Sequence, residues 1–435
     1  MCDIVVATPR ATRDHVMIFA KNSDRDPNEA QVLEYIPRLK HDEDRVRLTY
    51  VDFPQVKETY AILISRPWWI WGAEMGVNEF NLAIGNTAVF TRERIPTRGI
   101  LGMDIIRLAL ERTRSAREAL NFMVKVIEDY GQGGNASYEH KMLYSNSFMI
   151  ADPNEAWVLE TAGKYWVAKR IDTVYSISNA LTIDDDWDLA SDEVVRLSRR
   201  IRNFSFSRYF SDKVYTYFAH GRDRRRFTFN ALKAREGDIT LDYVMGILRG
   251  HAREPYYPWR GSMRDVCMHY GGYLRPTQTA SSQISILKGS GISTHWFTGT
   301  SLPCLSVFKP LFMIDDTEEV LKQVMGELPT NRYNPRNYWW ASEYLRRKLV
   351  MGFGSDAVRG YINDVRKLET EIINKWNEAI NNNSGRTDLA GLSAWAFNEE
   401  LRLIKKWMYV KIPSRAPFLY IWILRGINKK ANLII

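Results

Sequence analysis

Met1-Cys-Asp-Ile-Val-Val-Ala-Thr8 and His15-Val-Met-Ile-Phe-Ala-Lys-Asn22 are the two stretches that decide the fold. Both are rich in strand-forming residues, and a polar segment separates them. They therefore predict a β-hairpin over 3–8 and 15–22. Further strands are expected over 46–53, 59–66 and 82–86, so the chain begins as antiparallel sheet.

A helix pair follows these strands. Leu101–Thr113 carries apolar residues at helical spacing. Ser115-Ala-Arg-Glu118 is a capping-box pattern that opens a second helix, which is expected to end near Gly131. Short strands are then predicted over 147–151, 156–161, 165–170 and 174–179. Two antiparallel groups of strands are thus expected to flank the helix pair. Later predictions are helices near 191–203 and 240–250 and strands over 278–287, 294–298 and 305–313.

The chain changes character from Thr317. Long helical patterns cover 317–328, 338–351, 356–382 and 389–409. We place a boundary near residue 314, which gives a main domain over 1–314 and a helical C-terminal segment over 315–435.

Composition excludes several classes of protein. Of the 435 residues, 45% are hydrophobic and 26% are charged, as in globular proteins. The net charge is +9, but residues 401–435 carry eight Lys and Arg and no acid, so residues 1–400 carry only 9 − 8 = +1. No nucleic-acid-binding body is therefore expected. The aromatic residues of the basic tail favour a helix packed on the body, with binding to an anionic surface as the alternative.

Cysteine usage and the N-terminal sequence indicate a cytoplasmic protein without a metal or another cofactor. Three cysteines, Cys2, Cys267 and Cys304, make no disulfide framework. No Cys-x-x-Cys or His-Glu-x-x-His motif occurs. The first residues lack the features of a secretory signal, and no apolar run is long enough for a transmembrane segment.

Cys2 is the most informative residue. After loss of Met1, a terminal cysteine carries a nucleophile and a base in one residue. Its α-amine has a reference pKa of about 7.7–8.0, so it can take the thiol proton near neutral pH. A Cys/His pair that uses Cys267 or Cys304 is the alternative catalytic design.

Several ordered motifs place Cys2 in context, and together they resemble the secernins. They are Cys2-Asp3, Ala20-Lys-Asn-Ser-Asp-Arg25, Ser65-Arg-Pro67, Trp71-Gly-Ala-Glu-Met-Gly-Val-Asn-Glu79, Ile84-Gly-Asn-Thr-Ala-Val-Phe-Thr-Arg-Glu93, Gly102-Met-Asp104, Leu110-Glu-Arg112, Gly131-Gln-Gly-Gly-Asn135, Glu155-Ala-Trp-Val-Leu-Glu-Thr-Ala-Gly-Lys-Tyr-Trp166, Thr298-Gly-Thr300 and Ser306-Val-Phe-Lys-Pro310. The resemblance covers most of residues 1–315. Secernins are grouped with cysteine dipeptidases among the N-terminal-nucleophile (Ntn) hydrolases, which are related to penicillin V acylase and the bile-salt hydrolases.

The resemblance implies an α+β fold, a four-layer αββα Ntn-hydrolase sandwich with an added C-terminal helical segment. It implies a role for five residues. Cys2 would be the nucleophile, Asp24 would hold the terminal amine, and Lys21 would stand where the acylases have an arginine near the thiolate. Asn86 and Asn179 would supply oxyanion donors. A lysine lacks the planar fork of arginine, which leaves its role open.

The implied reaction is hydrolysis of an amide bond in a dipeptide or a small N-acyl compound, through a thioester on Cys2. The resemblance implies no cofactor and no metal, and a homo-oligomer is left open. The rival hypothesis is a secernin-like binding or regulatory protein without turnover. The basic run Arg222-Asp-Arg-Arg-Arg226 favours a solvated helix face, with an anion contact as the alternative. Core packing is favoured over a substrate pocket for Trp68, Trp69 and Trp71, and Gly131–Asn135 fits a helix stop or a loop over the pocket.

Overall fold

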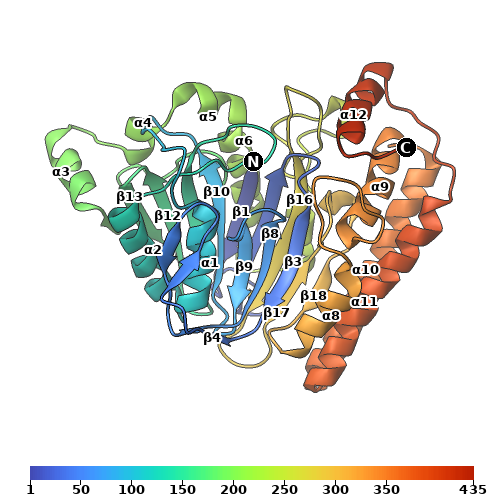
Figure 1. Cartoon of the computed structure of the whole chain (residues 1–435), viewed down its shortest axis with the longest axis horizontal. Helices are drawn as coiled ribbons and strands as arrows, with labels where there is room; N and C mark the ends of the chain where they lie inside the picture. Colours follow the sequence, from blue (N-terminus) through green and yellow to red (C-terminus); the bar gives the residue numbers. More distant parts are fainter.

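Two antiparallel sheets lie face to face at the centre of the molecule (Figure 1), in a computed structural model that describes residues 1–435. The six-stranded sheet has the order β14-β1-β2-β16-β17-β18. Its strands in chain order are β1 (Cys2–Ala7), β2 (Met17–Arg25), β14 (Val174–Ile177), β16 (Gln278–Leu287), β17 (Thr294–Phe297) and β18 (Lys309–Leu311).

The second sheet has eight strands in the order β15-β13-β12-β11-β10-β9-β8-β3. They are β3 (Gln31–Ile36), β8 (Ile62–Pro67), β9 (Met75–Asn78), β10 (Ala83–Val89), β11 (Ser145–Ala151), β12 (Ala156–Ala162), β13 (Tyr165–Arg170) and β15 (Leu189–Ala190). Two small ribbons pair β4 (Leu39–Lys40) with β7 (Glu58–Thr59) and β5 (Arg45–Arg47) with β6 (Asp52–Pro54).

Helices cover the outer face of each sheet. On the eight-stranded sheet these are α1 (Gly102–Arg112) and α2 (Ala116–Tyr130). The middle of the chain forms α3 (Asp192–Arg200), α4 (Phe206–Phe210), α5 (Lys213–Ala219), α6 (Gly221–Ala234) and α7 (Leu241–Leu248), followed by a single 3₁₀ turn η1 (Pro258–Arg260). A second such turn is η2 (Pro303–Leu305), and the C-terminal helices are α8 (Asp316–Met325), α9 (Tyr338–Met351), α10 (Asp356–Asn381), α11 (Arg386–Met408) and α12 (Phe418–Lys430).

Alternation along β1 explains why this strand is buried on both faces. Ile4 and Val6 point into the core between the sheets, whereas Val5 and Ala7 point into the core under α6 and α7. Side chains on a strand alternate between its two faces, so an almost continuous apolar run serves two cores at once. The hairpin pairs Ile4 with Lys21 and Cys2 with Ser23. The predicted hairpin is confirmed.

Other sequence predictions fare unequally. The helix pair is confirmed: Ser115 Oγ accepts from the Glu118 amide, and α2 ends at Gly131, whose φ is 76°. The strands on either side of that pair are not two separate sheets: β10 pairs with β11 in the eight-stranded sheet, whereas β1, β2 and β14 belong to the six-stranded sheet. The predicted strand over 46–53 is wrong, since the chain turns back there and makes only the ribbon β5–β6. The predicted strand over 305–313 shrinks to β18.

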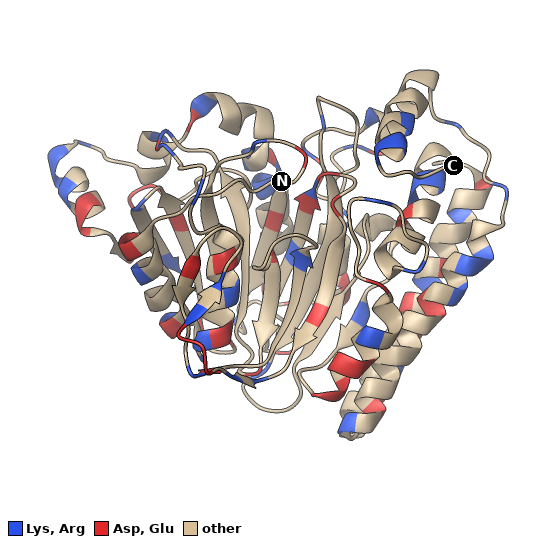
Figure 2. Ribbon diagram, viewed as in Figure 1, with Lys and Arg blue, Asp and Glu red and all other residues tan.

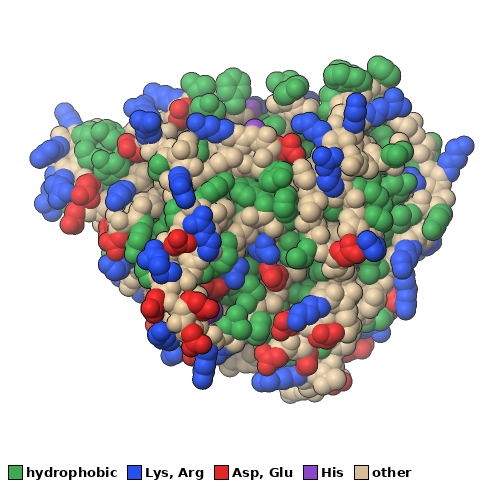
Figure 3. All heavy atoms as spheres, in the orientation of Figure 1, with side chains coloured by type: hydrophobic (Ala, Val, Ile, Leu, Met, Phe, Trp, Pro, Cys, Tyr) green, Lys and Arg blue, Asp and Glu red, His purple; other side chains and the backbone are tan.

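The C-terminal helices pack on the edge of the six-stranded sheet (Figure 1). Leu345, Val365 and Ile404 share a core with strand residues such as Ile284 and Trp296. No helix is both long and apolar enough to cross a membrane. The basic tail matches the packed-helix expectation only in part: Tyr420 on α12 is buried, but Phe418 and Trp422 are exposed. Figure 3 shows apolar side chains along the upper edge of the molecule, above α5 and α12.

Candidate active site

Cys2 lies at the start of β1 beside a small cavity. Its side chain is 5% exposed. The cavity has a volume of about 30 Å³, which is room for a water molecule rather than a dipeptide. Its lining includes Met1, Asp24, Glu29, Glu74 and Asn86. Most residues of the central strands are uncharged. Figure 2 shows charged residues at the ends of these strands near the N-terminus.

The Cys2 thiol is held in its neutral form in this state of the chain. Its Sγ lies 3.8 Å from Glu74 Oε2. Burial raises the pKa of the Cys2 thiol; Lys21 lowers it and Glu74 raises it again. Lys21 therefore acts in the direction that the sequence predicts, but it does not outweigh burial. The thiol needs a base beside it to become a nucleophile.

Lys21 is committed to a buried ion-pair network. Its Nζ donates to Glu74 Oε2 at 2.9 Å and to Asn86 Oδ1 at 3.3 Å. Arg25 Nη1 donates to Glu74 Oε1 at 3.0 Å. Burial alone would raise the pKa of Glu74, but the two cations lower it to about 2. Glu74 is not among the residues predicted from the sequence, although it stands in the motif Trp71–Glu79, because nothing in that motif shows which carboxylate turns inward.

Asp24 keeps one carboxylate oxygen free. Its Oδ1 accepts from Thr279 Oγ1 at 2.7 Å, whereas its Oδ2 is buried without a hydrogen-bond partner. Burial raises the pKa of Asp24 to about 6. The backbone of Met1 pairs with that of Asp24: the Met1 amine donates to Asp24 O at 2.9 Å, and the Asp24 amide donates to Met1 O at 2.8 Å. Met1 thus occupies the space beside the residue predicted to hold a terminal amine.

Asn179 holds the backbone nitrogen of Cys2. The Cys2 N–H donates to Asn179 Oδ1 at 2.9 Å, and Asn179 Nδ2 donates to Ala88 O at 2.8 Å. A carboxamide nitrogen carries two hydrogens, so one donor of Asn179 stays available. Asn86 Nδ2 donates to Asn146 Oδ1 at 2.8 Å and lies 3.4 Å from the Met103 sulfur. All five predicted site residues are therefore brought together around the start of β1, with Lys21 and Asp24 on β2, Asn86 on β10 and Asn179 just after β14.

Arg224 completes this arrangement and was missed. It is fully buried on α6, where its Nε donates to Asp3 Oδ2 at 2.9 Å and its Nη2 to Asn179 Oδ1 at 2.5 Å. Arg222 and Arg226 are exposed, as the solvated-face prediction requires. The run 222–226 shows that this segment is rich in arginine, but only the phase of helix α6 determines that Arg224 points inward. Gly221 lets α6 start against the backbone of Asn179, because a Cβ there would lie 2.6 Å from its carbonyl carbon.

The tryptophans and the glycine-rich loop lie near this cavity. Trp69 Nε1 donates to Glu29 Oε1 at 2.5 Å, and Trp68 packs on Tyr138 with ring centroids 4.9 Å apart. Arg25 Nη2 donates to the carbonyl oxygen of Ala136, directly after the loop. These contacts place one edge of the cavity between β2 and the segment that follows α2.

Comparisons with known proteins agree with the resemblance. The model of peptidase family C69 matches residues 10–235, just over half of the chain, and this match begins after Cys2. A probable dipeptidase A of Streptococcus pyogenes serotype M1 is 30% identical over 186 residues, which are 40% of this chain and 36% of that protein. The protein of the same name from serotype M3 (strain SSI-1) is also 30% identical over 186 residues, with 37% of its length covered. The match thus spans little more than a third of these curated relatives.

Among solved structures, the chain is similar to an acylase and to a bile acid hydrolase. Penicillin V acylase from Agrobacterium tumefaciens is 14% identical, with 72% of this chain and 86% of that chain covered and a TM-score of 0.44. A C2A mutant of conjugated bile acid hydrolase from Clostridium perfringens is 15% identical, with coverage of 68% and 88% and a TM-score of 0.41. On the extent of the family match, the chain belongs to peptidase family C69.

Proposed function

We propose that this chain is a cysteine hydrolase that cleaves the amide bond of dipeptides or small N-acyl compounds, with Cys2 as the nucleophile after removal of Met1. Membership of a peptidase family supports a peptide substrate. One observation carries the proposal: Asn179 Oδ1 accepts from the nitrogen of Cys2, and the cavity beside Cys2 is lined in part by Asp24, whose Oδ2 is buried without a partner. A free amine at this nitrogen would have an acceptor on Asn179 and a second one on Asp24.

The fold proposed for this reaction is the four-layer αββα Ntn-hydrolase sandwich. The helices outside each sheet and the apolar core between the sheets support it. We further propose that residues 1–314 form the hydrolase domain and that residues 315–435 are a helical addition, because the site described above draws only on residues before 280.

Removal of Met1 would change the site in two ways. It would convert the Cys2 N–H from an amide into an amine that can accept the thiol proton. It would also free the backbone groups of Asp24 that Met1 occupies and enlarge a cavity that now holds about one water. Both changes are needed for turnover of a dipeptide.

The reaction would then proceed in two balanced steps. The amine of Cys2 takes the thiol proton, and the thiolate attacks the carbonyl carbon of the substrate. The C–N bond breaks as the ammonium returns its proton to the leaving amine, which leaves a thioester. Water attacks this thioester with the amine again as base, and the carboxylic acid product leaves as the thiol reforms. Asn179 Nδ2 has a hydrogen free for the oxyanion, and one such donor is typically worth roughly 10²–10³ in rate.

Charges around the cavity favour a dipeptide with free termini. Arg25 Nε and Glu29 Oε2 are both buried without partners, and both residues line the cavity. An unpaired donor and an unpaired acceptor in one small site complement a substrate with a carboxylate and an ammonium group. Glu34, an acidic residue on β3, already pairs with Arg66, so its carboxylate is not available to bind the ammonium group of a substrate.

A panel of free dipeptides and N-acyl amino acids tests the proposal, with protein whose N-terminus has been determined. We expect hydrolysis by the wild type and a loss of about 10⁴-fold or more in Cys2→Ala. N-acetylated dipeptides are matched control substrates, and we expect them to be cleaved more slowly than their free counterparts. Equal turnover by the wild type and Cys2→Ala would exclude Cys2 as nucleophile.

A second candidate function, a binding protein without turnover, is favoured by one observation. With Met1 in place, the thiol of Cys2 is neutral and its nitrogen is an amide without basic character. If Met1 stays on the mature protein and no substrate in the panel is cleaved, this second function is the better account.

A further inference from the structure

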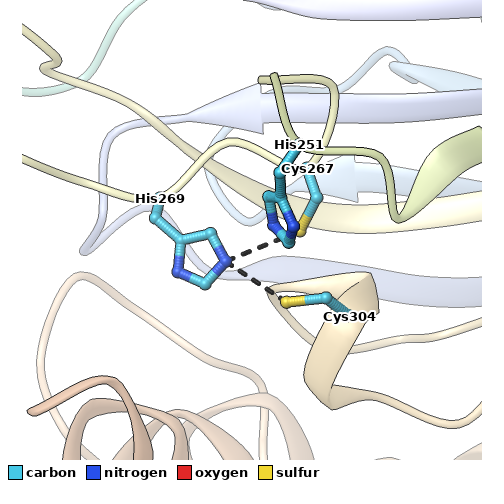
Figure 4. Close-up of side chains that lie close together, drawn as sticks. All are labelled: His251, Cys267, His269 and Cys304. Atoms are coloured by element: carbon cyan, nitrogen blue, oxygen red, sulfur yellow. Dashed lines mark hydrogen bonds between the residues drawn. The ribbon is translucent and has the colours of Figure 1, made fainter. Parts of the chain in front are cut away.

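Four residues from three separate segments of the chain bring two thiols and two imidazoles together. They are His251, Cys267, His269 and Cys304, and one ligand atom from each lies within 4.8 Å of all the others (Figure 4). His269 Nε2 lies 3.2 Å from Cys304 Sγ and 3.7 Å from Cys267 Sγ. Cys267, His269 and Cys304 are buried, and His251 is half-buried.

Three separate segments supply this cluster. His251 lies three residues after the end of α7, Cys267 and His269 stand on the segment that leads into β16, and Cys304 is in η2. The amide of Cys267 donates to Gly250 O at 3.0 Å, which fixes the first two segments against each other. The ring of His251 stacks on Tyr256 with centroids 3.5 Å apart. The backbone therefore holds the four side chains in place from different directions.

Hydrogen bonds among the four residues leave polar atoms unsatisfied. The Nε2 of His251 is buried and has no partner. Cys267 and Cys304 are both free thiols. Burying unsatisfied polar groups costs free energy, and thiol hydrogen bonds recover little of it. The reaction proposed for Cys2 uses none of these atoms.

We propose that His251, Cys267, His269 and Cys304 bind one zinc ion in a closed tetrahedral site. Two thiolates and two imidazoles are a ligand set that zinc favours. Around tetrahedral zinc, neighbouring sulfur and nitrogen ligands are about 3.3–3.8 Å apart, given the usual Zn–S and Zn–N bond lengths. The two separations at His269 already lie close to this range, and the widest one, 4.8 Å, needs to shorten by about 1 Å.

A Cys/His nucleophile pair is the other chemistry that these residues could support. Cys267 and His269 are almost completely buried, so neither is accessible to a peptide. Four protein ligands also leave no open position for water or substrate on the metal, so the site is structural rather than catalytic. The ligands come from positions 251 to 304 without short regular spacing, which is why sequence motifs do not reveal them.

The zinc site connects to the site of Cys2 through Met268, which stands between two of the ligands. Its amide donates to Thr279 Oγ1 at 2.9 Å, and Thr279 Oγ1 donates to Asp24 Oδ1 at 2.7 Å. The amide of Thr279 donates back to Met268 O at 2.9 Å. Metal binding would therefore fix the hydroxyl that orients Asp24. This connection rests on the proposed function, whereas the metal site itself does not.

The first experiment measures zinc in the full-length protein, purified without chelators, by inductively coupled plasma mass spectrometry. We expect about one zinc ion per chain in the wild type. In Cys267→Ser and Cys304→Ser, we expect the zinc content to fall by at least about tenfold. Two controls should keep their zinc. Cys2→Ser removes the third cysteine, and His15→Asn removes an exposed histidine whose φ of 52° asparagine tolerates.

The second experiment replaces zinc with cobalt in the wild type. Thiolate ligation produces a sulfur-to-cobalt charge-transfer band, which we expect in the wild type and in Cys2→Ser but not in Cys304→Ser. If the serine variants at 267 or 304 fail to fold, the wild-type spectrum decides by itself. Absence of the band, equal zinc in all variants, or a Cys267–Cys304 disulfide in metal-free protein as purified would each overturn the proposal.

Discussion

Two buried charge clusters in this molecule differ in what they leave unpaired. Under the C-terminal helices, Glu400 pairs with Lys309, Arg346 and the hydroxyl of Tyr338, and all of these side chains are almost fully buried. Lys309 also donates to Thr298 O at 2.7 Å. No polar side-chain atom of these four residues lacks a hydrogen-bond partner.

The cluster at Cys2 is as deeply buried but is incomplete. Asp24 Oδ2, Arg25 Nε and Glu29 Oε2 have no partner, and all three residues line one cavity. Buried polar groups normally have hydrogen-bond partners, so unpartnered donors and acceptors on residues that line a cavity indicate a site for a ligand. Buried charge by itself does not: the cluster at Glu400 is a structural element that joins α9 and α11 to β18.

Among substitutions that keep the Cys2 nucleophile, Asp24→Asn should produce the largest effect on activity. It keeps the shape of the side chain but removes the charge that would stabilise the protonated amine of Cys2. We expect kcat/KM to fall by at least about 10³-fold. Asp104→Asn is the matched control, because burial raises the pKa of Asp104 to about 6 as well, and its carboxylate contacts Thr49 and Gly72 instead. A similar loss of kcat/KM in both variants would remove the distinction between a catalytic and a structural carboxylate.

Glu400→Gln should affect folding and leave catalysis intact. It leaves Lys309 and Arg346 buried without their counter-ion, which typically costs 3–5 kcal/mol, here about 4. Urea denaturation measures this loss, and turnover per folded molecule should stay at the wild-type value. A fall in kcat that persists in fully folded protein would show that the two clusters are coupled.

The free energy of unfolding should depend differently on pH in the wild type and in Glu74→Gln at acid pH. The folded-state pKa of Glu74 is lowered to about 2 from an ordinary value near 4.5. A lowered pKa adds stability that is present above the unfolded pKa and is lost as pH falls from about 4.5 towards 2. The advantage of wild type over Glu74→Gln should therefore shrink by about 3 kcal/mol across this range, measured by urea denaturation at each pH. A constant difference would mean that the ion pairs with Lys21 and Arg25 contribute no net stability.

Cys304→Ser should lower turnover much less than Asp24→Asn does. Loss of zinc would loosen the backbone at Met268 and hence the hydrogen bond from Thr279 to Asp24. We expect kcat/KM to fall by about tenfold, mainly in kcat, because the ligands of the substrate are untouched. The activity of His15→Asn should match the wild type. Unchanged kcat in metal-free Cys304→Ser would not contradict the zinc site itself. It would show that zinc binding has no effect on the orientation of Asp24.

The sequence predicts the local elements near the site well, because their signals are local. The apolar run of β1 and the cap at Ser115 depend only on neighbouring residues, and both are observed. The strand predicted over 46–53 fails because a turn competes with β-propensity, and tertiary pairing decides the outcome. The positions of Cys2, Lys21 and Asp24 follow from one hairpin, so they were accessible from the sequence once the resemblance was recognised.

Residues that act through long-range packing were not predictable. Arg224 reaches Asp3 across 221 positions, and Glu74 meets Lys21 only when the two sheets stack. The four candidate zinc ligands have the same character, because three loops bring them together. In each case the sequence shows the type of residue, but it does not show which residue becomes its partner or whether its side chain is buried.

The most direct test of the central claim is mass spectrometry of the N-terminal peptide from active protein, quenched in acid during turnover of a dipeptide. The account predicts a peptide that begins at Cys2 with a free amine, and a fraction that carries the acyl group of the substrate as a thioester. An active preparation whose N-terminal peptide still carries Met1, with no acyl group on Cys2, would contradict it.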